Sequence, residues 1–197
     1  MAGLCAIFEI DMKKVIALST LSQLGVMIII LGRGFPSLAF FHLLSHAYFK
    51  AILFICAGIL IHRIKDYQDI RTMGHRKTSM PVTFAILMAA NISLCGLPFL
   101  RGFYSKDLIL EIIFSSGLGV VLFIIVLIGT FLTVAYSIRL SFLVGLNLVN
   151  SENMFLMDDR DRYMLGGILI LFPFALIGGI FISWSLFSYR PYILLPL

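Results

Sequence analysis

The sequence predicts an all-α integral membrane protein whose helices form one bundle. Of the 197 residues, 60% are hydrophobic and only 13% are charged, whereas a soluble domain carries about 25% charged residues. The mean hydropathy of +1.05 agrees with this class. Alternating apolar and polar positions, the pattern of a membrane β-barrel, are absent, so helices must satisfy the backbone in lipid. Stretches long enough to cross a core of about 30 Å occur at 15–32, 34–62, 78–100, 112–138 and 163–189.

Lysine and arginine residues gather on one side of these predicted crossings. We call the side that holds Lys13 and Lys14 side X, and the opposite side, with Arg33 and Arg190, side Y. Side X receives ten basic residues: Lys13, Lys14, Arg63, Lys65, Arg71, Arg76, Lys77, Arg139, Arg160 and Arg162. By the positive-inside rule, side X is the matrix or the cytoplasm. Topology therefore explains the formal net charge of +5, and no nucleic-acid partner is expected.

The third predicted helix, 80–116, is too long for one straight crossing, which needs roughly 20 residues. The run from Gly96 to Gly102 contains Pro98, which removes a backbone donor and clashes with the preceding turn. Broken helices at membrane depth line cavities or ion sites. We therefore expect a break at Gly96-Leu-Pro98 that presents Lys106 to a polar interior. The alternative is one long helix whose last residues reach water at the interface.

The second predicted helix carries three titratable side chains on one face. His42, His46 and Lys50 are spaced by four residues, which is about 400° of rotation per step. Lys50 falls near mid-membrane, where a charge costs several kcal/mol and usually has a task. Desolvation disfavours a charged amine, and histidine titrates near neutral pH, so the stripe suits proton transfer. Steps of about 6 Å require bridging water.

Structural roles compete with this interpretation. A single histidine inside a membrane is often a hydrogen-bonded contact between helices. The start of the first predicted helix carries a polar run, Ser19, Thr20, Ser22 and Gln23, which either faces a watery cavity or caps the helix at the interface. His42 and His46 are also spaced to share a metal ion, but no third ligand lies nearby in the sequence. The three cysteines are isolated, so neither a disulfide nor a metal site is implied.

Several motifs, in order, resemble the family of NADH dehydrogenase subunit 5, the distal antiporter-like membrane subunit of respiratory complex I. They are Asp11–Gly25, His42–Lys50, Gln68–Gly74 and Gly96–Asp107. The resemblance covers residues 1 to about 140 well and is weaker from 145 to 197. It implies the second of two inverted five-helix bundles, so we expect either an incomplete sequence or a split gene, and favour the former.

The resemblance implies a role for each candidate residue. Lys50 would belong to a central hydrophilic axis lined by His42 and His46, and Lys106 would carry protons on the broken helix, next to Asp107. The expected organisation is then as follows: 1–14, the end of a preceding helix and a matrix loop; 15–144, the bundle core with four helices; 145–162, a matrix loop; 163–197, the fifth helix and the C-terminal end.

The expected function is proton translocation in the mitochondrial inner membrane, as one subunit of a hetero-oligomeric NADH:ubiquinone oxidoreductase. This chain would hold no cofactor, since flavin, iron–sulfur clusters and quinone belong to other subunits. Its partners would be the other membrane-arm subunits and the lipid bilayer. Two alternatives stay open: a subunit of a multisubunit cation/proton antiporter without a redox partner, and a structural membrane anchor whose lysines are paired for assembly.

Overall fold

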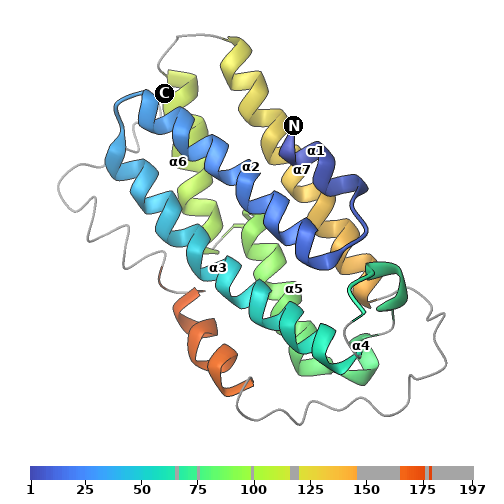
Figure 1. Cartoon of the computed structure of the whole chain (residues 1–197). Coiled ribbons are helices and arrows are strands. Elements are labelled where there is room, and N and C mark those ends of the chain that lie inside the picture. Colours follow the sequence, from blue (N-terminus) through green and yellow to red (C-terminus); the bar gives the residue numbers. More distant parts are fainter. Residues whose placement is uncertain are drawn as a thin grey trace.

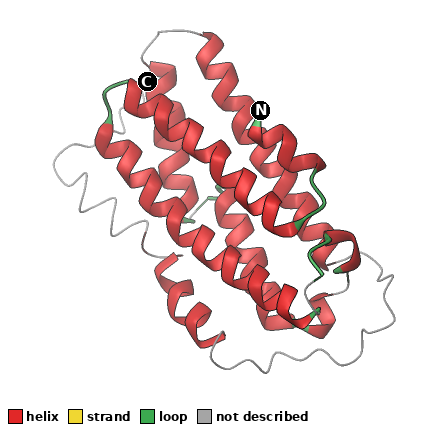
Figure 2. Cartoon of the chain, viewed as in Figure 1, coloured by secondary structure: helices red, strands yellow, loops and turns green. Residues whose placement is uncertain are grey.

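The computed structural model describes residues 1–64, 67–74, 76–98, 100–115, 120–145, 165–175 and 178. These residues form helices and connecting loops, without a strand among them (Figure 2). The elements are α1 (Ala2–Phe8), α2 (Met12–Gly32), α3 (Pro36–Arg63), the 3-10 turn η1 (Ile70–Thr72), α4 (Arg76–Ser79), α5 (Pro81–Cys95), α6 (Arg101–Ser115) and α7 (Val120–Gly145). A further short apolar helix spans Leu165–Ala175.

Three of these helices, α2, α3 and α7, are long and apolar enough to cross a membrane. Together with α5 and α6, the two halves of a broken helix, they form a helical membrane bundle, which confirms the predicted all-α fold class. The charge-free stretch 112–138 divides between the end of α6 and most of α7. The predicted fifth helix is described over Leu165–Ala175, and the predicted loop 145–162 lies outside the described residues after Gly145.

The helix α3 lies at the centre of the bundle and is the most buried of the three long helices. It packs against α2, α5 and α6, while α7 covers α1, α2, α5 and α6 (Figure 1). A tight turn joins α2 to α3, in which Gly34 has a φ of +81° that a side chain would disfavour. Pro36 then begins α3, where its missing N–H costs no helical hydrogen bond.

The predicted break between α5 and α6 is present. The helix α5 ends at Cys95, and Gly96 follows with a φ of +88°, a left-handed cap that favours glycine. After Pro98, α6 begins at Arg101. A Cβ added to Gly102 would collide with the backbone carbonyl oxygen of Ser93, so glycine permits the close approach of the two halves. The sequence thus specifies the break at two glycines and one proline.

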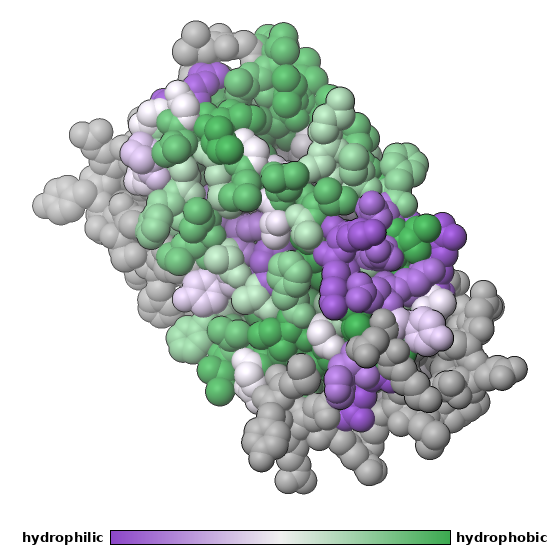
Figure 3. Space-filling view, viewed as in Figure 1, coloured by the Kyte–Doolittle hydropathy of each residue, from purple (hydrophilic) through white to green (hydrophobic). Residues whose placement is uncertain are grey.

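Polar contacts gather at one end of the bundle, near the start of α2. Asp11 and Asp69 form an isolated antiparallel bridge, and Lys14 pairs with Asp11 at 2.8 Å. The Arg139 guanidinium of α7 donates to the backbone carbonyls of Ile7 and of Glu9, at 2.7 Å for the latter. Figure 3 shows one face of the molecule, on which hydrophilic side chains gather in one region and apolar side chains cover much of the rest. This end corresponds to side X.

Candidate functional site

Lys50 is held inside the bundle by the neighbouring helix α2. Its side chain is 5% exposed, and its Nζ donates to Ser19 Oγ and, at 3.4 Å, to the carbonyl oxygen of Ile16. Ser19 Oγ in turn donates to the same carbonyl at 2.7 Å. A buried charge without partners is costly, so these oxygens make the position tolerable for an ammonium group. The predicted mid-membrane lysine therefore sits in a specific polar site.

His42, two turns before Lys50 on α3, contacts two other helices with its two ring nitrogens. Nδ1 lies 3.1 Å from Ser105 Oγ of α6, and Nε2 lies 3.2 Å from Gln23 Oε1 of α2. Ser45, on the next turn of α3, places its Oγ 3.3 Å from Ser105 Oγ. The histidine therefore joins α2, α3 and α6 through buried hydrogen bonds.

His46 lies between His42 and Lys50, as the four-residue spacing predicts. The His42 and His46 ring centroids are 6.3 Å apart, with the rings tilted by 36°. The His46 Nε2 atom is buried and has no hydrogen-bond partner among the residues that the structure describes. The hydrogen-bonding capacity of this nitrogen is thus unused among the described residues.

Lys106 on α6 reaches back to the end of α5. Its Nζ donates to the carbonyl oxygen of Leu94 at 2.5 Å and to Thr133 Oγ1 of α7 at 3.2 Å. The last carbonyls of a helix lack intrahelical partners and carry the negative end of the helix dipole. Because α5 ends at Cys95, the break creates the acceptor that holds the Lys106 ammonium. The broken helix presents Lys106 to a polar interior, as expected.

Four of the five predicted residues line the interior of the bundle, and one does not. The helix α3 contributes His42, His46 and Lys50, and the facing side of α6 contributes Lys106. Asp107, in contrast, is exposed on the outer face of α6. Adjacent helical residues point about 100° apart, which separates Asp107 from the hydrogen bonds of Lys106. The proton-transfer role of Asp107 stays a prediction.

Several contact residues were not among the predicted site residues: Ser19, Gln23, Ser105 and Thr133. Ser19 and Gln23 are spaced by four residues within the polar run of α2, and this spacing predicts that the two side chains share one face of the helix. The structure places both in the interior against Lys50 and His42. No side-chain hydrogen bond caps the start of α2, so the capping interpretation does not apply.

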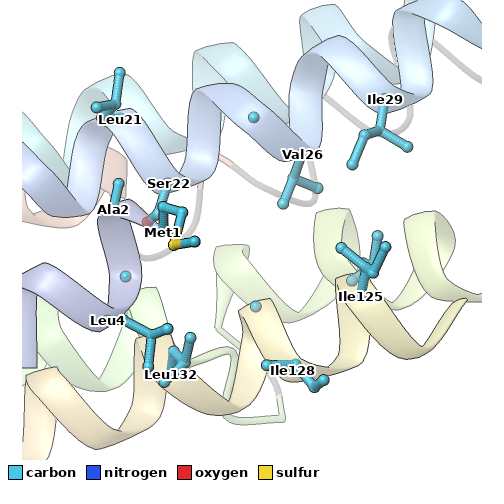
Figure 4. A pocket seen from close by; sticks show the side chains of 14 residues that line it. Met1, Ala2, Leu4, Leu21, Ser22, Val26, Ile29, Ile125, Ile128 and Leu132 are labelled. Atoms are coloured by element: carbon cyan, nitrogen blue, oxygen red, sulfur yellow. The ribbon is translucent and has the colours of Figure 1, made fainter. Parts of the chain in front are cut away.

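Neither a metal site nor an open cavity is found at these residues within the described part of the chain. No group of three His, Cys, Asp or Glu side chains suited to a metal occurs in the described ranges. A cavity of about 400 Å³ opens between α1, α2 and α7 and is lined mainly by apolar side chains such as Val26, Ile125 and Leu132 (Figure 4). Neither lysine of the site lines it, so the cavity does not reach the candidate residues.

A helical membrane bundle with buried lysines beside a broken helix has the features of an ion-translocating membrane protein. Comparison with known proteins specifies the family. The model of the transmembrane region of NADH:quinone oxidoreductase and Mrp antiporters matches residues 1–133, so the chain belongs to this family. The model of the NADH dehydrogenase subunit 5 C-terminus matches residues 136–197, which extends the resemblance through the region where the motifs are weak.

Named relatives agree with this assignment. The chain is 52% identical over 197 residues to NADH-ubiquinone oxidoreductase chain 5 of Anopheles gambiae, and 41% identical over 197 residues to that of Lumbricus terrestris. Each alignment covers all of this chain and 34% of the relative, so the chain spans about a third of their length. The resemblance to subunit 5 is thereby confirmed.

A solved structure supports the same fold. The chain is similar to a protein in the structure of the membrane-bound sulfane sulfur reductase, an archaeal respiratory membrane complex. The TM-score is 0.79 with 31% sequence identity, and the match covers 86% of this chain and 28% of the other.

Proposed function

We propose that this chain forms part of the proton-translocating membrane arm of NADH:ubiquinone oxidoreductase, respiratory complex I, in the mitochondrial inner membrane. It assembles there with the other membrane-arm subunits and supplies no redox group, since flavin, iron–sulfur clusters and quinone belong to other subunits. One observation carries the proposal: a buried and a partly buried lysine on neighbouring helices, each held by oxygen acceptors, in a chain 52% identical to an oxidoreductase chain 5.

The two lysines are suited to a coupled transfer of protons. Lys50 and Lys106 belong to α3 and α6, which pack against each other, so a positive charge on one lysine opposes a positive charge on the other. A proton that arrives at Lys50 therefore favours release of a proton from Lys106, and the reverse. Leu94 O and Thr133 Oγ1 hold the Lys106 ammonium until that release.

The histidines bridge the space between these lysines. His46, with its free buried Nε2, is the intermediate nearest to Lys50 along α3, and His42 continues the line toward α6. Ring separations of 6.3 Å are too long for direct transfer, so bridging water completes the path. Asp107 exchanges protons on the outer face of α6, beyond Lys106.

Replacement of Lys106 tests the proposal. In the assembled complex, Lys106→Ala is expected to lower the number of protons pumped per NADH oxidised, because the residue that loads and releases them is gone. Lys13→Ala is the matched control, since it removes an exposed lysine at the start of α2. An assembled Lys106→Ala complex that pumps at the normal ratio would overturn the proposal.

The antiporter alternative is separated from the oxidoreductase by its cofactors. The family model covers both NADH:quinone oxidoreductases and Mrp antiporters, and the same lysines would serve either. The C-terminal match to NADH dehydrogenase subunit 5 favours the oxidoreductase. A purified complex that contains this chain is expected to show flavin and iron–sulfur absorbance, and its absence would support the antiporter.

A further inference from the structure

The hydrogen bonds of His42 bring together three helices at a fully enclosed position. Gln23 from α2 and His42 from α3 are each 3% exposed, and Ser105 from α6 is 0% exposed. Each ring nitrogen of His42 has its own partner, Ser105 for Nδ1 and Gln23 for Nε2. Ser105 also directly precedes Lys106 in α6. A displacement of α6 would therefore change the hydrogen bond between Ser105 and the His42 ring.

The chemistry of the two partners determines which nitrogen of His42 carries the hydrogen. A neutral imidazole has one donor and one acceptor nitrogen, and an amide oxygen only accepts. Because Gln23 presents Oε1 to Nε2, this nitrogen carries the hydrogen and donates it. Nδ1 then has a free lone pair, which accepts the hydroxyl hydrogen of Ser105.

We infer that Gln23 and Ser105 are positioning residues that restrict proton exchange at His42 to its Nδ1 atom, on the side of Lys106. The inference rests on the proposed function and deepens it. The Gln23 amide cannot pass a proton onward, so the Nε2 side of the ring is closed. His42 thus gains and loses its proton at the same atom, Nδ1, by exchange with bridging water, while His46 keeps an unpartnered nitrogen.

Ser105 can serve both protonation states of His42. The arriving proton comes, through water, from the Lys106 ammonium, which becomes a neutral amine. The new Nδ1–H then donates to Ser105 Oγ, and the Ser105 hydroxyl turns its hydrogen to the Gly102 carbonyl oxygen 3.3 Å away. When the proton leaves Nδ1, the hydroxyl turns back and donates to the ring. His42 Nδ1 and Ser105 Oγ therefore each keep a hydrogen-bond partner in both states.

The test measures proton pumping per assembled complex in variants of the two partners. Ser105→Ala and Gln23→Met are each expected to lower the coupled pumping rate about fivefold, the factor that one net hydrogen bond carries. The control Ser141→Ala removes another buried interhelical hydroxyl, which accepts from Asn91 at 3.0 Å and touches neither histidine nor lysine of the site. It is expected to leave the rate per assembled complex unchanged.

A double-mutant cycle with His42→Ala separates positioning from a general structural effect. If Ser105 and Gln23 act through His42, adding either substitution to His42→Ala lowers the rate no further. Multiplied effects in the double variants, or normal rates in both single variants, would overturn the inference. If Ser105→Ala prevents assembly, Gln23→Met on α2 tests the same ring from the other nitrogen.

Failure of this inference differs from failure of the proposed function. A complex that loses pumping with Lys106→Ala but keeps it with Ser105→Ala and Gln23→Met retains the function and refutes the positioning of His42. A complex in which Lys106→Ala itself pumps normally refutes the function.

Discussion

Gly102 offers the sharpest test of how the helix break creates the site. A Cβ at this position would meet the carbonyl oxygen of Ser93, and real Cβ atoms do not approach other atoms within 3.0 Å. The atoms that this Cβ would meet belong to the backbone and cannot rotate away as a side chain could. In Gly102→Ala the two halves of the broken helix must therefore separate by on the order of 1 Å. Ser93 directly precedes Leu94, whose carbonyl oxygen holds Lys106 at 2.5 Å.

This displacement has a calculable effect on the Lys106 contact. A separation of about 1 Å stretches the hydrogen bond to about 3.5 Å, beyond the normal range for N–H···O. Misplacement of a reacting group by 1 Å can lower a rate about 100-fold. We therefore expect Gly102→Ala to lower proton pumping per assembled complex by about one to two orders of magnitude.

The assay is proton pumping by the purified complex in proteoliposomes, divided by the amount of assembled complex on a native gel. Gly58→Ala is the matched control, because Gly58 lies within α3 and a Cβ there meets no atom within 4 Å. An assembled Gly102→Ala complex with normal pumping would show that the close approach of α5 and α6 is not needed for Lys106 to work.

Three further substitutions test individual contacts. Gly96→Ala should destabilise the bundle by about 1–2 kcal/mol, because the backbone φ of +88° at this position disfavours a side chain. An unchanged midpoint of thermal inactivation would contradict this expectation. Arg139→Met should lower the free energy of unfolding by about 1.5–3 kcal/mol, since the guanidinium donates to two backbone carbonyls at the end of α1. The loss of these hydrogen bonds should be detected as faster proteolysis near Glu9. Tyr136→Phe should change thermal stability by less than about 1 kcal/mol, because its buried hydroxyl lies near Ser19 and Ser22 but makes no hydrogen bond of normal geometry among the described residues. A large loss of stability in that variant would reveal a bound water or a partner subunit at the hydroxyl.

The helices and the break follow from local properties of the chain. Long apolar stretches must form helices in lipid because each backbone group needs an internal partner. Gly96 and Pro98 interrupt the third of them through backbone conformation and a missing donor, which depend on neighbouring residues alone. The shared face of His42, His46 and Lys50 follows likewise from the helical repeat.

The partners of these side chains depended on the packing of helices that are distant in the sequence. Lys50 meets Ser19 across 31 positions of the chain, and His42 meets Ser105 across 63. No local rule pairs such residues, because a polar side chain in an apolar helix can face another helix, a cavity or the helix end equally well. Asp107 belongs to a motif that predicts a site residue, but its side chain is exposed. The step of about 100° between adjacent helical residues turns it away from the direction of Lys106.

The sequence by itself determined the membrane class, the long apolar helices, the break and the place of Lys50 in the middle of a long apolar helix. Tertiary structure alone decided that the free carbonyl of Leu94 receives Lys106, and that Gln23 and Ser105 hold the two nitrogens of His42. The physical reason is that helix formation is local, whereas the satisfaction of a buried charge or ring requires atoms from several helices at once.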